Sequence, residues 1–292
     1  MVSVGLPVYN GERYLAQAVE SILTQDIDLE LLIADNASTD ATGEIARDIA
    51  ASDARVRYLG SNENRGATWN YNRLVPLARG RYFKWAAHDD LCGPGFLRSC
   101  TDVLDDEPSA ALAYPRTVLI DEFGAVTDRG FVDGLAIDDP SPVGRFARYI
   151  DHSGEQHAVF GVIRQSILAR TSLIANCWGG DVVLLAQLVL LGPFLEIPDR
   201  LFLRRYHGGS SLVANRSPAE VAQWFDPTRR GRTALPRTRL LRELACVVAR
   251  ADLGPADRAR CLAILATRWS MRYGRVMGGE VKLFARSITS GV

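Results

Sequence analysis

The sequence has very few lysines. Only Lys84 and Lys282 occur among its 292 residues, so chemistry that needs a lysine amine, such as Schiff-base formation, has almost nothing to use. Neither Gly-x-x-x-x-Gly-Lys-[Ser/Thr] nor Gly-x-Gly-x-x-Gly is present. These absences argue against a P-loop ATPase and against a dinucleotide-dependent dehydrogenase.

The sequence also lacks the marks of a secreted or membrane-spanning protein. Its five cysteines form no Cys-x-x-Cys pair and are odd in number, which favours reduced thiols over a disulfide or zinc framework. No signal peptide is recognisable at the N-terminus. The longest apolar run, Val182 to Leu191, is interrupted by Gln187 and is too short to cross a bilayer. We therefore expect a cytoplasmic globular protein of one large domain or two smaller ones.

Charge is balanced over the chain but not along it. The formal net charge is zero, yet residues 217–292 hold 14 Lys and Arg against 6 Asp and Glu. Such a basic segment can face nucleic acid, an anionic membrane or an acidic partner, although a solvated helical face or docking onto the acidic body is commoner. We expect no nucleic-acid partner, and a peripheral contact with the inner face of the membrane only as the lesser alternative.

The first 90 residues alternate between strand and helix patterns. Apolar runs predict strands at residues 2–8, 29–34, 56–59 and 82–87, and helical spacing of apolar residues predicts helices between them. Asn10 is expected to cap the first of these helices, with Glu12 in its first turn. Successive strand-helix units predict an α/β fold with a mostly parallel, doubly wound sheet flanked by helices.

Polar residues follow the predicted strands at the ends where such sheets bind ligands. Pro7 to Asn10, Asp35 with Asn36, Asn62 to Gly66, and His88 to Asp90 all fall at these ends. One crevice could therefore collect all of them.

Asp89 and Asp90 are adjacent carboxylates at the end of the fourth predicted strand. Two such groups repel each other and resist desolvation, so a positive partner is expected beside them. Mn²⁺ or Mg²⁺ suits these hard oxygen ligands and commonly binds one or two carboxylates together with phosphate oxygens. The alternative is that the pair caps a helix beginning near Pro94.

Together these segments resemble the family-two glycosyltransferases of bacterial type, which have the GT-A fold and transfer a sugar with inversion. The resemblance covers residues 2 to about 212. It rests on Val4-Gly5-Leu6-Pro7-Val8-Tyr9-Asn10-Gly11, Ile33-Ala34-Asp35-Asn36-Ala37-Ser38-Thr39-Asp40, Asn64-Arg65-Gly66 and Ala87-His88-Asp89-Asp90. The family's Asp-x-Asp-Asp signature lacks its first carboxylate here, because Ala87 stands in that place.

The resemblance implies a hexosyl or deoxyhexosyl transfer from a nucleotide-diphosphate sugar, with a UDP- or TDP-sugar as the expected donor and an unidentified hydroxyl as acceptor. It implies that Asp35 binds the base, that Asp89 lies near the ribose, and that Asp90 and His207 bind Mn²⁺ or Mg²⁺. The full set of expected donor-binding residues is Pro7, Tyr9, Asn10, Glu12, Asp35, Asn36, Arg65, Gly66, His88, Asp89, Arg204 and Arg205. For Arg204 and Arg205 the physical reason is that a guanidinium matches diphosphate oxygens.

Asp181 is the expected catalytic base. It follows Gly179-Gly180 and opens the apolar run from Val182, which matches the place of the acidic base in inverting members of the family. A helix N-terminus there would favour the ionised carboxylate. The alternative is that Asp181 is only a helix cap.

The remaining predictions concern organisation. We expect a glycosyltransferase domain over residues 1–215, with a nucleotide-binding half (1–107) and an acceptor-side half (108–215), and an arginine-rich helical extension over 216–292. Residues 128–151, rich in Gly, Pro and Asp, are expected to be irregular. The extension is expected to pack on the body or to pair subunits in a homodimer. A non-catalytic sugar-nucleotide-binding scaffold and, less favoured, a nucleotidyltransferase stay open as alternatives.

Overall fold

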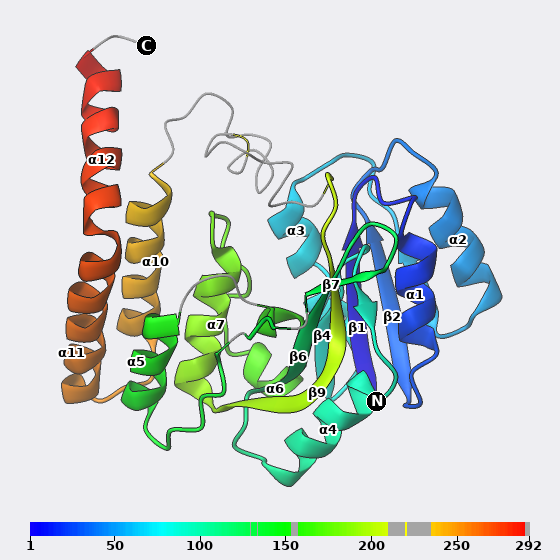
Figure 1. Cartoon of the computed structure of the whole chain (residues 1–292), viewed down its shortest axis with the longest axis horizontal. Helices are drawn as coiled ribbons and strands as arrows, with labels where there is room; N and C mark the ends of the chain where they lie inside the picture. The colour runs from blue at the N-terminus through cyan, green and yellow to red at the C-terminus, as the bar shows by residue number, and fades with distance from the viewer. Residues whose placement is uncertain (129, 133, 153–156, 210–219, 221–234, 290–292) are drawn as a thin grey trace.

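A computed structural model describes residues 1–128, 130–132, 134–152, 157–209, 220 and 235–289. It has one large sheet with helices on both faces (Figure 1). The strands run in the order β3-β2-β1-β4-β8-β6-β9-β5, and β7 pairs with β6 outside this path. Their bounds are β1 (Val2–Val8), β2 (Leu29–Asp35), β3 (Val56–Leu59), β4 (Tyr82–Trp85), β5 (Leu91–Cys92), β6 (Leu112–Ile120), β7 (Val126–Asp128), β8 (Val162–Arg164) and β9 (Phe194–Arg205).

The helices fall into a set that precedes residue 192, most of which lie against the sheet, and a C-terminal set at one side of the molecule, next to α5 (Figure 1). The first set is α1 (Leu15–Leu23), α2 (Thr42–Ser52), α3 (Ala67–Asn72), α4 (Phe96–Asp106), α5 (Pro142–His152), α6 (Gln165–Leu168) and α7 (Gly180–Leu191). The second set is α10 (Pro236–Arg250), α11 (Pro255–Ile264) and α12 (Ser270–Thr289), with a π-helical turn at Leu265–Trp269 between the last two.

The sheet is parallel where the sequence alternates strand and helix. Strands β3, β2, β1 and β4 are mutually parallel. The side chains of these strands pack into two cores on opposite faces of the sheet. Val4 and Leu6 of β1 pack with α1 and α4, whereas Leu32 and Ala34 of β2 pack into the core that contains α7. Beyond β4 the sheet is mixed, because β8 is antiparallel to β4 whereas β6 and β9 run parallel. The expected α/β GT-A architecture is confirmed.

Lys84 is fully buried in the centre of this sheet. Its ammonium donates to the carbonyl of Phe160 at 2.5 Å and to that of Trp85 at 3.0 Å, and it lies 4.5 Å from the ring centroid of Phe96. Burial lowers the pKa of Lys84, as expected for an ammonium without a carboxylate partner among these contacts.

Two expectations about local structure are wrong. Helix α5 begins at Pro142, inside the stretch expected to be irregular, because Phe146, Tyr149 and Ile150 recur at helical spacing and are buried together. Proline at the first helical position does not interrupt a helix. In addition, α1 begins only at Leu15, so Asn10 is not its cap.

The C-terminal helices pack on the body rather than standing apart from it. Leu240, Leu244 and Trp269 are buried and share one core cluster with α5 and α7. The domain boundary expected at 215/216 lies outside the described residues. Among the described helices, none combines the length and the apolar character that crossing a bilayer requires.

Candidate active site

The carboxyl ends of β1 and β2 form one wall of the candidate site around Asp35. Val8 and Asp35 are partners in the parallel register, which brings the polar residues after the two strands together. The Asp35 carboxylate accepts a hydrogen bond from the Ser38 amide at 2.9 Å and another from the Tyr58 hydroxyl at 2.9 Å. These two hydrogen bonds fix the orientation of the Asp35 carboxylate, which is buried. Pro7 is buried beside it and Tyr9 is 44% exposed.

Asn36 fastens the loop that carries Arg65 and Gly66. Its side-chain amide donates to Asn64 at 2.9 Å and to the Gly66 carbonyl at 3.3 Å, and its oxygen accepts from the Arg65 amide at 3.1 Å. The Arg65 guanidinium lies over the Trp69 ring at 4.3 Å. Asn36 and Gly66 thus shape the crevice through backbone contacts, and Arg65 is exposed at its edge.

Asn10 and Glu12 join two neighbouring turns instead of opening α1. The Asn10 side-chain oxygen accepts from the Thr39 amide at 2.9 Å, and a Glu12 carboxylate oxygen accepts from the Ala41 amide at 2.9 Å, at the start of α2. Asn10 has φ 53°, a left-handed conformation that asparagine tolerates better than most residues. Asn10 and Glu12, both expected to bind the sugar donor, therefore hold neighbouring turns of the protein together in this structure.

Asp89 and Asp90 point to different partners. Asp89 Oδ2 lies 2.9 Å from Nε2 of His207. Asp90 instead pairs through Oδ2 with Nη1 of Arg204 at 2.5 Å, and its Oδ1 accepts from the Arg205 amide at 2.9 Å. The positive partner expected beside the pair is thus Arg204, which contacts Asp90, while Asp89 contacts His207. The pair does not cap the following helix, because β5 intervenes and Gly95 precedes α4.

The two carboxylates differ in charge environment as well. Burial acts to raise the pKa of Asp89, but the hydrogen bond to His207 and the neighbouring cations hold it at about 2. For Asp90 burial dominates and raises the pKa, with Arg204 opposing that effect and Asp89 adding to it. The Asp90 side chain is only 3% exposed, so both of its oxygens are enclosed by protein.

Arg205, an expected donor-binding residue, makes all of its side-chain hydrogen bonds inside the protein. It is 1% exposed, and its guanidinium donates to the Asp89 carbonyl, the Gln17 side chain and the carbonyls of Asp121 and Glu122. All of its nitrogens are used inside the protein, so its role is to hold the carboxylate loop against α1. Arg204 is 11% exposed and is engaged with Asp90.

The two histidines near this loop are held by packing. The ring of His207 lies 4.8 Å from that of Tyr14, centroid to centroid. His88 covers Gly11, where a Cβ atom would come within 2.5 Å of the imidazole, so glycine is required for this close approach. His88 is partly exposed and contributes to the low pKa of Asp89.

A sequence model described as glycosyl transferase family 2 matches residues 3–167. The chain belongs to this family. The matched stretch contains Asp35, Asp89 and Asp90, whereas Asp181, Arg204 and the other expected residues of the second half lie beyond it.

Relatives of this glycosyltransferase match less than half of its length. Chondroitin synthase of Escherichia coli is 36% identical over 132 residues, which are 45% of this chain and 19% of that protein. Glycosyltransferase GlyG of Streptococcus pneumoniae is 36% identical over 92 residues, 31% of each chain. This chain therefore spans about a fifth of the length of the chondroitin synthase.

Solved structures resemble nearly the whole fold. S. aureus TarS 1–349 in complex with UDP-GlcNAc has a TM-score of 0.70 at 16% identity, covering 92% of this chain and 72% of that one. The mannosyltransferase PcManGT from Pyrobaculum calidifontis, in complex with GDP-Man and Mn²⁺, has a TM-score of 0.60 at 16% identity, covering 100% and 76%. At this identity the likeness shows the fold alone.

Asp181 of this glycosyltransferase lies in the first turn of α7. Gly179, with φ 74°, precedes the helix, so Asp181 is inside the first turn and is not the cap. Burial raises the pKa of Asp181, and the backbone amides at the helix start and Arg204 act in the opposite direction. The expectation that the helix end would favour the ionised form is therefore wrong in its net effect, because desolvation outweighs it.

Tyr71, on α3, was missed by the sequence analysis. Burial raises the pKa of its phenol, the charges of Asp89, Asp90 and Asp181 add to this effect, and Arg204 opposes it. Tyr71 thus feels charges from both halves of the chain. Its neighbours in the sequence, Asn70 and Asn72, give no pattern that singles it out.

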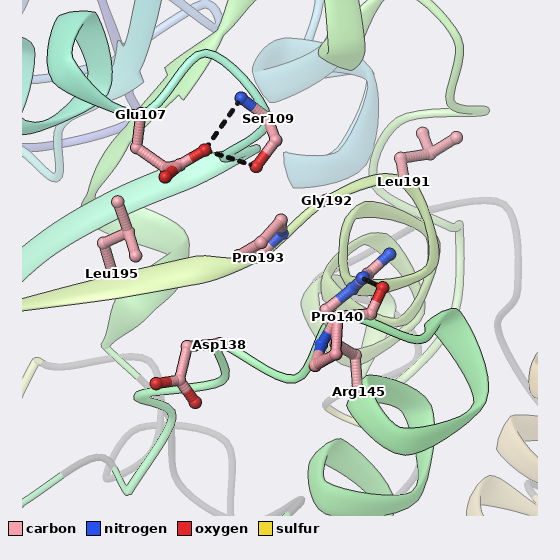
Figure 2. A pocket seen from close by; sticks show the side chains of 9 residues that line it. All are labelled: Glu107, Ser109, Asp138, Pro140, Arg145, Leu191, Gly192, Pro193 and Leu195. Carbon is pink, nitrogen blue, oxygen red and sulfur yellow. Dashed lines mark hydrogen bonds between the residues drawn. The ribbon is translucent and has the colours of Figure 1, made fainter.

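A hollow in the described residues lies elsewhere. It measures about 420 Å³ and is lined by Glu107, Asp138, Arg145 and Leu191 among others (Figure 2). Leu191 ends α7, so this hollow is at the opposite end of that helix from Asp181. Arg145 donates there to the carbonyls of Val189 and Leu190 and closes the end of the helix. The hollow is therefore separate from the candidate active site.

Proposed function

We propose that this glycosyltransferase transfers a hexosyl or deoxyhexosyl group from a UDP- or TDP-sugar to an acceptor hydroxyl, with inversion. The observations that support the proposal are that Asp35 ends β2 at the carboxyl end of the parallel strands, that Asp89 lies 2.9 Å from His207, and that Arg204, which pairs with Asp90, also acts on the charge of Asp181. TarS in complex with UDP-GlcNAc supports a nucleotide-sugar donor.

Asp35 is proposed to bind the base. Its carboxylate is oriented by the Ser38 amide and the Tyr58 hydroxyl, so it can accept further hydrogen bonds from a ligand without moving. Tyr9 is exposed at the rim and offers an aromatic face. Binding of the diphosphate would then direct the sugar toward Asp89 and Asp181.

A divalent metal fits Asp89 and His207 better than Asp90. Asp89 Oδ2 and His207 Nε2 are 2.9 Å apart and supply a carboxylate oxygen and an imidazole nitrogen, whereas Asp90 is enclosed by two arginines. Within the described residues no group of three His, Cys, Asp or Glu side chains could hold a metal. Two protein ligands plus diphosphate oxygens is the usual arrangement for Mg²⁺, and Mn²⁺ accepts the same donors. When bound, such an ion supplies charge stabilisation to the leaving diphosphate.

Asp181 is proposed to accept the proton of the acceptor hydroxyl. As that oxygen bonds to the anomeric carbon, the bond from this carbon to the diphosphate oxygen breaks, and a single displacement inverts the configuration. A raised pKa makes Asp181 a stronger base than an ordinary aspartate, and general-base catalysis typically contributes roughly 10²–10⁴-fold. Arg204 keeps Asp90 neutralised and lies close enough to act on Asp181.

The first experiment is thermal melting against UDP, TDP and GDP, each with and without Mn²⁺. A ligand at 100 times its Kd adds about 2.7 kcal/mol to the free energy of unfolding. A Mn²⁺-dependent shift with UDP or TDP supports the proposed donor class. A melting shift with GDP alone would indicate a GDP-sugar as the donor instead. No shift with any nucleotide would contradict the assignment of Asp35 as the base-binding residue.

Hydrolysis of UDP-GlcNAc, TDP-glucose and GDP-mannose then tests turnover without a known acceptor. Slow hydrolysis that requires Asp181 supports the transferase mechanism. Nucleotide binding without hydrolysis of any donor would favour the scaffold alternative.

A further inference from the structure

We infer that the C-terminal helices are a brace that positions Asp181, with Arg237 and Arg239 as its positioning residues. The inference rests on the proposed role of Asp181 as the base. It concerns the turn of residues 176–180, which leads into α7, and the start of α10, which lies against that turn.

The turn has little freedom of its own. The Gly180 amide donates to the Cys177 carbonyl at 3.0 Å, and the Val183 amide donates to the Gly179 carbonyl at 3.1 Å. A Cβ atom on Gly180 would meet the Ala175 carbonyl oxygen at 2.1 Å, so the backbone passes itself too closely for any other residue. A displacement of this turn would therefore carry Asp181 with it.

The start of α10 holds the turn from outside. Arg239 Nη2 donates to the carbonyl of Asn176 at 2.8 Å, and Leu240 lies 2.9 Å from the position of a Cβ atom on Gly179. The Arg237 guanidinium lies over the ring of Trp178 at 4.0 Å. Asn176, Trp178 and Gly179 of the turn thus each contact a different residue of α10.

Helix α12 in turn holds the start of α10. The Glu280 carboxylate accepts hydrogen bonds from the Arg237 amide at 3.0 Å and from the Thr238 amide at 3.1 Å, which caps α10. The Tyr273 ring centroid lies 4.4 Å from the Arg237 guanidinium. Arg237 therefore contacts an aromatic ring of the turn and one of α12, and Figure 1 shows α10 lying between α7 and α12.

This arrangement gives the basic extension a reason to be present in an enzyme whose family match ends at residue 167. A base must be held at the reacting hydroxyl, and a misplacement of about 1 Å can cost roughly 10²-fold in rate. Donor binding depends on Asp35 and the loops of the first half, which the brace does not contact in the described residues.

The test compares Arg237→Ala with Arg260→Ala, a matched control on α11 whose side chain is 71% exposed and pairs only with Asp257 among the contacts described. Hydrogen exchange of the amides from Cys177 to Val183 measures the turn directly and needs no acceptor. Hydrolysis of the donor of the above panel that turns over fastest gives the rate and the KM.

For Arg237→Ala we expect faster exchange in the turn and a roughly 10- to 100-fold lower hydrolysis rate, with the donor KM and the UDP-induced melting shift unchanged. Arg260→Ala should change none of these. If Arg237→Ala does not fold, Arg239→Ala, which removes one hydrogen bond to Asn176, decides the question with a smaller effect of the same kind.

Exchange and turnover equal to those of Arg260→Ala in a folded variant would overturn the inference. Faster exchange with unchanged turnover would also overturn it, because the brace would then be only structural. Failure of the proposed function has a different signature: Asp181→Asn would keep full turnover, whatever the exchange of the turn shows.

Discussion

The two halves of the site are built in different ways. In the first half, Asp35 and Asn36 are oriented by residues near them in the sequence or on adjacent parallel strands. In the second half, the groups that face them come from far along the chain, since Arg204 pairs with Asp90 over a separation of 114 residues and His207 meets Asp89 over 118. In the proposed mechanism the first half provides recognition of the nucleotide, and the second half supplies the partners of Asp89 and Asp90 together with Asp181.

The largest expected effect separates these two contributions. Asp181→Asn removes the proposed base without changing its volume, so turnover should fall by roughly 10²–10⁴-fold while the UDP-induced melting shift stays that of the wild type. Asp257→Asn is the matched control, because Asp257 also lies in the first turn of a helix. Equal loss of nucleotide binding in Asp181→Asn would show that the halves do not divide in this way.

The next effect concerns the ion pair that joins the halves. Arg204→Met leaves Asp90 buried without its cation, which should cost about 3–5 kcal/mol in the free energy of unfolding, measured by urea titration. Adding Asp90→Asn removes the uncompensated charge and should restore part of the loss. An Arg204→Met variant as stable as the wild type would mean that the Arg204–Asp90 ion pair does not stabilise the contact between the two halves of the site.

A smaller effect is expected within the first half. Tyr58→Phe removes one hydrogen bond to Asp35, which should weaken UDP binding by about 1 kcal/mol in calorimetry, or roughly fivefold. Tyr82→Phe removes a similar bond to Asp105 and is the control, since it lies at the start of β4 away from the site. Equal affinities of the two variants for UDP would argue against Asp35 as the base-binding residue.

The smallest effect is on stability and follows from the raised pKa of Asp181. The native state resists ionisation of this group more than the unfolded state does, so stability falls as the pH rises above the unfolded-state pKa, and the loss is complete above the raised native pKa. Asp181→Asn should therefore raise the urea midpoint at pH 7, and the difference should shrink as the pH falls toward 4. A lower midpoint at pH 7 would show that the helix start stabilises the ionised form after all.

Prediction from sequence succeeded where structure is local. The parallel strands and the clustering of polar residues at their ends follow from alternation and strand order alone, because parallel strands put their carboxyl ends at one edge. The start of α5 was not foreseen, since Phe146, Tyr149 and Ile150 are buried by partners distant in the sequence.

The individual roles were harder to predict than the set of residues. Arg204 and Arg205 are adjacent and identical in type, yet one pairs with a carboxylate at the site and the other is enclosed beneath it. Asp89 and Asp90 are likewise adjacent and identical in type, yet Asp89 contacts His207 whereas Asp90 pairs with Arg204. Adjacent residues on an extended chain point to opposite sides, and which side faces the crevice depends on the strand pairing that the sequence does not specify.

The burial of Lys84 has a practical consequence for labelling. Since its ammonium is fully enclosed in the sheet, amine-reactive reagents can reach only Lys282, which is exposed on α12, and the N-terminal amine. A fluorophore coupled above pH 8 would therefore label one lysine and the N-terminal amine in the native protein. That lysine follows Glu280 by two residues, so a dye on it would report directly on movements of the C-terminal helices.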